Sequence, residues 1–493
     1  MQHQRSFLCR LGLPLTFAIA MLFPGWSNAA DRTWTQGAGG DFLEPSNWIN
    51  DDLPSAGDTV YFDAAGLDPY TVEFHDDFEL RSGKTGRIYL QTGNQAIFKL
   101  YDDEGSYALS SFSLQVNHGT LTLDGGTTTV NEVLTVGAGE GGSGTLKLTN
   151  GAVLNGTISN DYYRVGNSAS GAMVLEQGSS ATFVKRLQIG YKTGGGGSSV
   201  TVSEGSSLEV IGTGGIYLGS SEANVSGDLP TATSDNSLSV SGGSTVSTSR
   251  LYIGYREGAD NNTVVVGGAA GETGSTLTVS GFLRVGIGSG SGAVGNSLTI
   301  RDGGELTASD LFQVAAGNTF TVEEGGRATS TNTGLNNSIR GTIAIKGGQF
   351  TAGTLHIRNL VTLEGGSFEL TADLYTFADS RFEFTLDNNL TINVGGKLTV
   401  DGITSIDITG LAGGAIPGTY TLFSSTTASG LDLFTLGNTF EGFEGALSYD
   451  ANHLYLNVTA IPEPGAAWFS LLAFPLLWQA CRHRPGITST SVG

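Results

Sequence analysis

Short runs of alternating apolar and hydroxyl side chains recur through the middle of the chain. From His118 to about Phe377 one order returns: a four-residue run of the form Thr/Ser-Leu-Thr-Val, a Gly-Gly or Gly-Ser pair, a shorter run, and then Leu-x-Ile/Val-Gly. Alternation with a period of two is typical of a β-strand that buries one face. The pattern therefore predicts two or three short strands in each repeat, joined by turns in which glycine supplies the positive φ angles.

One apolar position marks the first strand of each repeat, and a pair of apolar positions marks the third. The predicted first-strand positions are Leu121, Leu146, Met173, Val200, Leu238, Leu277, Leu298, Phe320, Ile343 and Val361. The predicted third-strand pairs are Leu134 with Val136, Leu187 with Ile189, Ile216 with Leu218, Leu251 with Ile253, Leu283 with Val285, and Leu355 with Ile357. An extra strand is predicted at 263–266 and an insertion at 222–236.

Repeats of this size predict a stacked fold. A unit of about 20–27 residues cannot bury its apolar face alone, whereas stacked units can. We therefore expect an all-β, right-handed parallel β-solenoid (β-helix) over 118–385, in which equivalent Leu, Val and Ile side chains form internal ladders. Ten coils at about 4.8 Å each would extend roughly 50 Å. A β-sandwich array or a propeller is the alternative, but both need longer and more regular units.

The flanking regions are expected to close the two ends of the solenoid. We predict an N-terminal β capping region over 31–117 and a C-terminal β cap over 386–460. Trp34 and Trp48 are expected to plug the first coil, because an uncapped coil exposes both its core and its strand edges. A second hypothesis assigns these two rings to glycan contact by stacking on sugars.

The first thirty residues have the pattern of a signal peptide. Arg5 and Arg10 precede an uncharged apolar stretch over 11–23, and small residues follow at 27 and 29. Thirteen apolar residues span only about 20 Å as a helix, which is too short for a stable membrane anchor. We therefore expect removal of the segment 1–30, with cleavage after Ala29 or Ala30.

The last 33 residues, 461–493, combine a short motif, an apolar stretch and basic residues. Pro462, Glu463 and Pro464 precede 17 further uncharged residues, long enough for a transmembrane helix, and Arg482 and Arg484 follow. This arrangement resembles the PEP-CTERM sorting signal of Gram-negative bacteria. The resemblance implies recognition of the Pro-Glu-Pro motif by an exosortase-type processing enzyme and membrane contact before processing. Pro475 and the nine residues after Arg484 depart from the family pattern, and an ordinary membrane tail is the alternative.

The repeat itself resembles autotransporter-associated β-strand repeats. The resemblance is carried by the segments GTLTLDGG, STLTVSG and SLTIRDGG at 119–126, 275–281 and 297–304. The segment that includes Trp34, Trp48 and Tyr61-Phe62-Asp63 is similar to the one that opens many of those proteins. This resemblance implies the solenoid fold more than any activity.

Charge and cysteine content narrow the class of partner. The chain carries a net charge of −22, and its two cysteines, Cys9 and Cys481, lie in the terminal segments. Without those segments, which hold four of the 24 basic and one of the 46 acidic residues, the body has a net charge of −25 and no disulfide. Such a charge disfavours nucleic acid as a partner. Neutral polymers or cations fit better.

No catalytic or cofactor motif is present in the sequence, so we predict no cofactor and no enzyme activity. The histidines at 75, 118, 356 and 453 have no metal-ligand spacing. The carboxylate pairs at 76–77, 102–103 and 323–324 are typical of solvated turns, although they would also suit calcium or sugar cleavage. The alternative is a β-helix polysaccharide lyase or glycoside hydrolase, which would need carboxylates from successive coils to coincide.

The positions predicted to face outward carry small hydroxyl side chains instead. They are Thr120/Thr122, Ser199/Thr201, Ser237/Ser239, Thr276/Thr278, Ser297/Thr299 and Thr319/Thr321. Threonine is favoured on exposed strands in general, which accounts for these positions without a specific function. The alternative is that they form an ice-binding array. We expect an exported structural or adhesive protein of the cell envelope or extracellular matrix of a Gram-negative bacterium, in contact with exopolysaccharide or other surface glycans.

Overall fold

The computed structural model describes most of the chain between the two predicted targeting segments. It covers residues 29–460 except 65–68, 81–84, 103–104, 140–141, 158–162, 193, 221–231, 269–270, 272–273, 287–291, 335–336, 387–389, 412–416 and 439–442. The predicted signal peptide up to residue 28 and the sorting residues Pro462, Glu463, Pro464, Arg482 and Arg484 lie outside the described residues.

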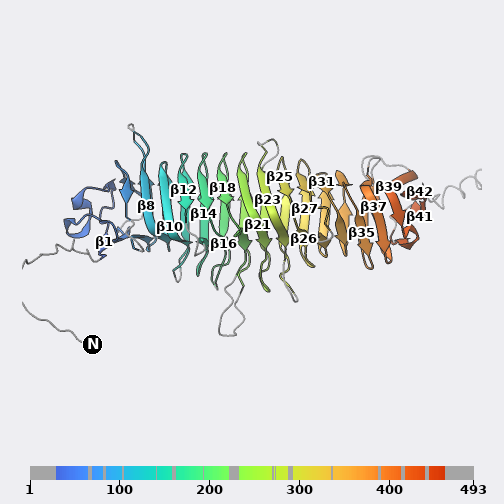
Figure 1. Cartoon of the computed structure of the whole chain (residues 1–493), viewed down its shortest axis with the longest axis horizontal. Helices are drawn as coiled ribbons and strands as arrows, with labels where there is room; N and C mark the ends of the chain where they lie inside the picture. The colour runs from blue at the N-terminus through green and yellow to red at the C-terminus, as the bar shows by residue number, and fades with distance from the viewer. Residues whose placement is uncertain are drawn as a thin grey trace, which may run out of the picture.

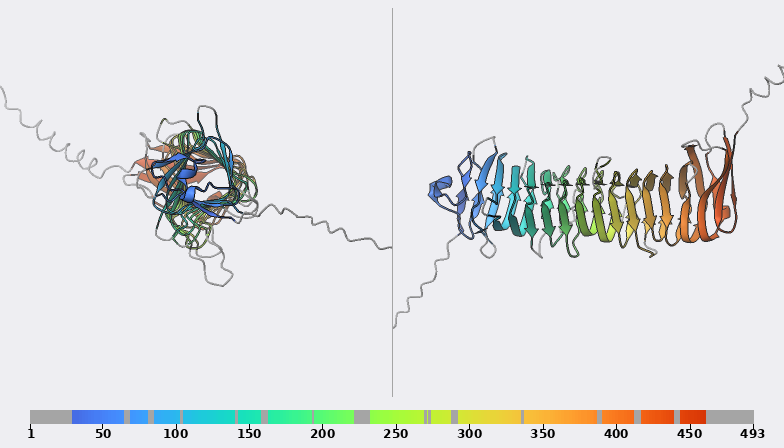
Figure 2. Two further views of the ribbon diagram at one scale, coloured as in Figure 1. Left: turned by 90° about the vertical axis from the view of Figure 1, so that its left-hand side faces the viewer. Right: turned by 90° about the horizontal axis from the view of Figure 1, so that it is seen from above.

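The described chain winds into a long parallel β-solenoid with three strand-bearing faces (Figures 1 and 2). Face 1 is a sheet of 16 strands, and faces 2 and 3, together with two antiparallel strands at the C-terminal end, form a second sheet of 26 strands. The second sheet is continuous because six strands run from face 2 into face 3. The all-β parallel β-solenoid predicted from the repeats is confirmed, whereas its right-handed sense stays a prediction.

Face 1 contains one strand from each turn of the chain. Its strands are β2 (Gly40–Asp41), β4 (Tyr70–Glu73), β7 (Gln95–Lys99), β9 (Gly119–Asp124), β11 (Gly144–Thr149), β14 (Gly171–Leu175), β17 (Ser199–Val202), β20 (Ser237–Val240), β22 (Thr263–Val266), β24 (Ser297–Ile300), β27 (Thr319–Glu323), β30 (Thr342–Lys346), β33 (Leu360–Leu363), β36 (Arg381–Leu386), β38 (Thr404–Leu411) and β40 (Phe434–Leu436).

Six strands contribute to both face 2 and face 3. They are β8 (Ala108–Val116), β10 (Thr127–Val136), β21 (Thr245–Ile253), β23 (Thr276–Val285), β37 (Ile392–Asp401) and β39 (Gly418–Ser429). The strands confined to face 2 are β5 (Phe78–Glu79), β12 (Val153–Gly156), β15 (Ser180–Phe183), β18 (Ser207–Val210), β25 (Glu305–Ala308), β28 (Arg327–Ser330), β31 (Gln349–Ala352) and β34 (Ser367–Leu370).

The strands confined to face 3 are β1 (Asp31–Thr33), β3 (Thr59–Tyr61), β6 (Arg87–Leu90), β13 (Tyr163–Val165), β16 (Leu187–Ile189), β19 (Ile216–Leu218), β26 (Phe312–Val314), β29 (Ser338–Ile339), β32 (Leu355–Ile357) and β35 (Leu374–Phe377). Short 3-10 turns occur at η1 (Pro45–Asn47), η2 (Ile49–Asp51) and η3 (Leu431–Leu433). None of the described residues forms a helix long and apolar enough to cross a membrane.

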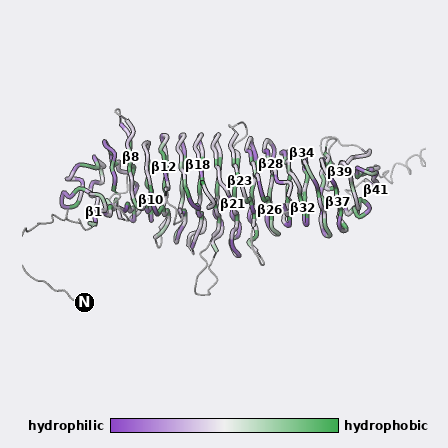
Figure 3. Tube along the Cα trace, in the orientation of Figure 1, coloured by the Kyte–Doolittle hydropathy of each residue, from purple (hydrophilic) through white to green (hydrophobic). Residues whose placement is uncertain are grey.

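Equivalent apolar side chains stack in register inside the solenoid, as predicted. On face 1, Leu121 pairs with Leu146, Leu146 with Met173 and Met173 with Val200, and all four are at most 1% exposed. Apolar and polar residues alternate along the strands (Figure 3). The apolar side chains of all three faces belong to one continuous core.

One predicted first-strand position belongs to another face. Leu277 lies on β23, where it pairs with Val246 and Leu306 of face 2. Its place in the face 1 ladder is taken by Val264, which pairs with Leu238 and Leu298 on the strand predicted as an extra one. The other predicted first-strand positions all lie on face 1, and every predicted third-strand pair lies on face 3.

A ladder of buried asparagines runs along the corner before face 1. Asn236, Asn262, Asn296 and Asn318 are at most 1% exposed, and each directly precedes a face 1 strand. The Nδ2 group of each of the first three donates to Oδ1 of the next, at 2.7, 2.9 and 2.9 Å. The same Oδ1 atoms accept backbone N–H groups from the preceding coil. The ladder thus satisfies backbone groups that the corner would otherwise bury without partners.

The parallel pairing extends on both sides of the repeat predicted at 118–385. At the N-terminal end, β2, β4, β7 and β9 pair in parallel, as do β1, β3 and β6. At the C-terminal end, β36, β38 and β40 pair in parallel, as do β37 and β39. Beyond them, β39 pairs with β42 (His453–Ala460) and β42 with β41 (Phe443–Tyr449), both antiparallel. The 16 strands of face 1, at about 4.8 Å each, give a length of roughly 70 Å instead of the expected 50 Å.

Candidate functional site

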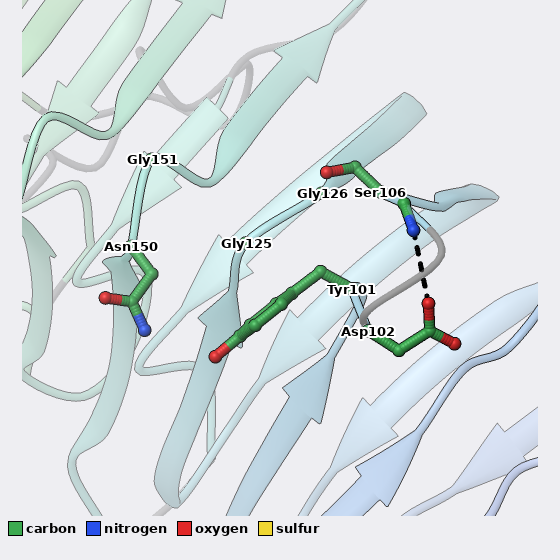
Figure 4. A pocket seen from close by; sticks show the side chains of 8 residues that line it. Tyr101, Asp102, Ser106, Gly125, Gly126, Asn150 and Gly151 are labelled. Carbon is green, nitrogen blue, oxygen red and sulfur yellow. Dashed lines mark hydrogen bonds between the residues drawn. The ribbon is translucent and has the colours of Figure 1, made fainter.

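A polar groove of about 560 Å³ opens at the corner between faces 1 and 2 (Figure 4). Three successive turns of the chain line it, with the residues Tyr101, Asp102, Gly105, Ser106, Gly125, Gly126, Asn150 and Gly151. Tyr101 and Ser106 form an antiparallel bridge that closes a small loop at one side of the groove. The ring of Tyr101 is half-buried, so one aromatic face is held beside exposed amide and backbone groups.

Left-handed turn residues make room for this ring. Gly125 and Gly126 have φ angles of 66° and 61°, and Asn150 and Gly151 have 53° and 70°. A Cβ atom on Gly125 would lie 2.6 Å from Cδ1 of Tyr101, and one on Gly126 would lie 2.4 Å from Cβ of Leu100. The glycine pair is therefore required both by the backbone conformation and by the space that Tyr101 and Leu100 occupy.

Asp102 is fixed at the edge of the groove by its hydrogen bonds. The Tyr107 hydroxyl donates to its carboxylate at 2.8 Å, and the backbone N–H of Gly105 donates at 3.2 Å. Nδ1 of His75 lies 3.1 Å from Oδ2 of Asp102. This hydrogen bond is the main reason that the pKa of His75 is raised, and the carboxylates of Asp41 and Glu73 add to it. Asp102 thus both stabilises this loop and holds the His75 imidazole in place.

Among the residues that the structure describes, the predicted carboxylate pairs are not brought together into one metal-binding cluster. Asp77 accepts the backbone N–H of Ala108 at 2.7 Å, and Asp102 lies at the groove, whereas Asp103 is outside the described residues. Over the described ranges, no group of three His, Cys, Asp or Glu side chains is arranged to hold a metal ion. The lyase or hydrolase alternative stays a hypothesis.

Trp34 and Trp48 are not available for contact with a surface glycan. They are 0% and 2% exposed, and their rings pack edge to face with centroids 5.2 Å apart. Their indole N–H groups donate to the backbone carbonyls of Gln36 and Phe42. The hypothesis of sugar stacking by these rings is corrected, because they lie in the apolar core at the N-terminal end of the solenoid.

The hydroxyl side chains predicted to face outward form two columns on face 1. Along β9, β17, β20, β24 and β27 the predicted pairs occupy equivalent register positions, and most of them are half-buried. The columns are interrupted on the strands between these by Lys147, Ala172, Val174 and Val265. Thr276 and Thr278 lie on face 2 instead, because β23 starts there. The structure thus gathers five of the six pairs on a single face.

Sequence comparison adds no assignment to this geometry. No family model and no curated protein matches the chain. The groove, the hydroxyl columns and the terminal motifs must therefore carry any functional proposal.

The repeat pattern of the sequence predicts neither the groove nor the asparagine ladder. The sequence does contain a signal for the ladder. Asn occurs at 236, 262, 296 and 318, and each Asn is followed by Ser or Thr and then by Leu, Val or Phe. The signal for the groove was weaker. A Gly-Gly or Asn-Gly pair after a strand indicates a left-handed turn, but it does not reveal that Tyr101 from the previous turn packs on it.

Ala30 holds a defined position beside a buried carboxylate. Asp58 is 2% exposed and accepts the Ala30 N–H at 2.8 Å, the Ser55 N–H at 2.9 Å and Nε of Arg32 at 3.2 Å. Burial raises the pKa of Asp58, but the hydrogen bonds from Ala30, Ser55 and Arg32 outweigh it, so the net pKa lies below the usual value. Cleavage after Ala29 would keep the Ala30 donor, and cleavage after Ala30 would remove it.

Proposed function

We propose that this protein is an exported structural or adhesive component of the cell envelope or extracellular matrix of a Gram-negative bacterium, associated with surface polysaccharide. The observation that carries the proposal is the repetition of outward hydroxyl groups at equal register positions on face 1. Hydroxyl groups both donate and accept hydrogen bonds, as sugars do. Weak contacts repeated along a rigid surface add up through multivalency.

The groove supplies the one aromatic contact in this proposal. Tyr101 offers its ring, and Asn150 offers its amide oxygen beside it, because the Nδ2 group of Asn150 already donates to Asp124. An apolar ring face combined with a few polar groups suits a sugar, whose faces are apolar and whose rim is polar. The groove therefore supports a neutral glycan end or branch as the bound group.

Removing the Tyr101 ring tests this association. We expect the variant Tyr101→Ala to bind a neutral glycan array about ten-fold more weakly than the wild-type chain, because the ring face is lost. Tyr449→Ala is the matched control, since Tyr449 is 55% exposed at the opposite end of the solenoid. Equal binding by the wild type and both variants would count against the groove as a glycan site.

We also propose that the chain is exported and sorted by its terminal segments. The contact between Ala30 and Asp58 supports cleavage after Ala29, because the new α-ammonium group would then lie beside a buried carboxylate. The resemblance of 461–493 to the PEP-CTERM signal supports processing by an exosortase-type enzyme at the Pro462-Glu463-Pro464 motif, with Arg482 and Arg484 on the cytoplasmic side.

Alanine substitution of Pro462, Glu463 and Pro464 should block this sorting. The wild-type product is expected to begin at Ala30 and to lack Arg482, whereas the triple variant is expected to remain longer and in the membrane fraction. Intact-mass measurement of the surface and membrane fractions distinguishes the two products. Ile403→Ala is the control, because Ile403 is 65% exposed on the solenoid body and should be processed as the wild type is. Release of the triple variant at the wild-type length would disprove the sorting proposal.

A further inference from the structure

Basic side chains are gathered on one face of this acidic chain. Between residues 119 and 300 there are eight Lys and Arg residues. Seven of them lie on face 3 strands or on residues beside those strands: Arg164, Lys185, Arg186, Lys192, Arg250, Arg256 and Arg284. The eighth, Lys147, lies on face 1 and forms an ion pair with Glu176 at 2.7 Å. Face 3 of this stretch thus holds most of its basic residues, although Glu132 and Glu257 also lie on or beside its strands, within a chain of net charge −22.

The arginines stack on aromatic rings in a continuous series. The Arg186 guanidinium lies 4.0 Å from the Tyr217 ring centroid, and the Tyr217 and Tyr252 rings are 4.7 Å apart. Arg284 lies 5.7 Å from the Tyr252 ring and 5.3 Å from Phe282. We call the set Arg186, Tyr217, Tyr252, Tyr255, Arg250, Arg256, Phe282 and Arg284 the arginine–aromatic strip.

Strand register produces this series. Gln188, Tyr217, Tyr252 and Arg284 occupy one column of face 3 on the side away from the core, and Arg250 pairs with Phe282 in the next column. Gln188, Tyr217 and Tyr252 are only 2%, 2% and 6% exposed, so the half-buried Arg250 and Arg284 and the exposed Arg256 form the accessible part of the strip. Successive members are therefore about 4.8 Å apart along the solenoid. Gly215 lies beside Arg250, and a Cβ atom added to Gly215 would lie 2.6 Å from Cβ of Arg250. The glycine leaves the space in which the arginine side chain lies.

Three arginines of the strip lack an acidic partner. Arg250, Arg256 and Arg284 form no ion pair with any carboxylate that the structure describes. Nε of Arg284 is buried and has no acceptor within the described chain. Arg381, by contrast, contacts both Glu383 and Asp407. The strip therefore retains positive charge and hydrogen-bond donors that the protein itself does not use.

We propose that the arginine–aromatic strip binds an acidic polysaccharide through its carboxylate groups. The N–H donors of a guanidinium lie in the plane of the group, so they remain available when one face of the group stacks on a ring. Two of them can then donate to the two oxygens of one carboxylate. Repetition along the axis suits a polymer with an acidic group on successive sugars. This inference rests on the proposed association with surface polysaccharide and narrows its class.

The net negative charge of the chain does not prevent this contact. At physiological salt the Debye length is about 8 Å, so charges on the other faces are largely screened from a ligand on face 3. A lipid surface is less well matched, because none of the exposed large apolar side chains among the described residues belongs to the strip. We therefore favour a soluble polyanion that follows the strip over a membrane.

The test is a binding measurement on the full-length exported protein with polygalacturonate as the probe. The wild type is expected to bind at about 0.15 M salt, and Arg250→Gln/Arg284→Gln is expected to bind at least about ten-fold more weakly. Lys147→Gln/Lys346→Gln is the matched control, since it removes the same charge from face 1. Arg256→Gln provides a second variant, because Arg256 is exposed and its replacement leaves the half-buried Arg250 and Arg284 in place.

The outcomes separate this inference from the proposed function. Loss of binding in the strip variants with retention in the control supports the inference. Equal loss in the control, or binding only to phosphatidylglycerol vesicles or to duplex DNA, overturns it. If polygalacturonate does not bind but a neutral glycan still binds in a Tyr101-dependent manner, the strip inference fails and the proposed function stands. If neither polygalacturonate nor a neutral glycan binds, both the strip inference and the proposed function are disproved.

Discussion

Replacing Asn262 with Ala is expected to lower the free energy of unfolding by about 2–4 kcal/mol. The Asn262 side chain accepts the backbone N–H and the Nδ2 group of Asn236 and donates to Asn296 and Ala259. Alanine would leave the buried N–H of Asn236 without its acceptor and would open a cavity in the corner. Urea unfolding followed by circular dichroism measures the loss.

The control for this prediction is an asparagine outside the ladder. Asn393 lies exposed on β37, so Asn393→Ala should change the free energy of unfolding by less than about 0.5 kcal/mol. Asn262→Asp is a second variant, because a carboxylate cannot donate to Oδ1 of Asn296 and carries a buried charge. If Asn262→Ala, Asn262→Asp and Asn393→Ala all unfold at the urea concentration at which the wild type unfolds, the ladder contributes nothing to stability.

Replacing Trp48 with Ala is expected to cost about 3–5 kcal/mol of stability, because it empties a fully buried site. The Trp48 ring packs against Trp34, Phe42 and Phe62, with centroids 5.2 to 5.8 Å apart. Its loss would expose the core at the first coils, which have parallel neighbours on one side only. Hydrogen exchange of β1 and β3 should rise before that of the central coils.

Two comparisons distinguish this structural role from glycan contact. Ile49, the next residue, is 48% exposed, and Ile49→Ala should leave stability within about 0.5 kcal/mol of the wild type. Trp48→Phe keeps an aromatic ring in the core, so it should be less destabilising than Trp48→Ala and should bind glycans as the wild type does. A stable Trp48→Phe protein with lost glycan binding would restore the surface-contact hypothesis.

The repeat pattern was sufficient to predict the fold but not the face of every strand. Leu121, Leu146 and Leu238 were assigned correctly because alternation identifies the buried side of a strand. Leu277 was assigned to the wrong face because the Thr-Leu-Thr-Val run of β23 on face 2 is the same as a face 1 run. Only the pairing of Leu277 with Val246 and Leu306 distinguishes the two faces.

The functional surfaces were less predictable because they join residues from different turns. Arg186, Arg250 and Arg284 are separated by 64 and 34 residues, since the loops between the strands differ in length. No fixed spacing in the sequence therefore marks the strip. The Tyr101 groove likewise depends on the next turn placing Gly125 against the ring. Alternation predicts which side chains face outward, whereas the neighbours of each side chain can be predicted only when the strand register is known.

The parallel register has a mechanical consequence for the proposed role at a cell surface. The hydrogen bonds between strands run along the solenoid axis, and each coil contacts only the coils next to it. A pulling force along the axis would therefore detach coils one after another from an end. The coil between Leu298 and Phe320 contains 22 residues, so its release would convert about 4.8 Å of rod into roughly 75 Å of extended chain. Such a molecule would act as an extensible tether that lengthens under shear before its attachment breaks.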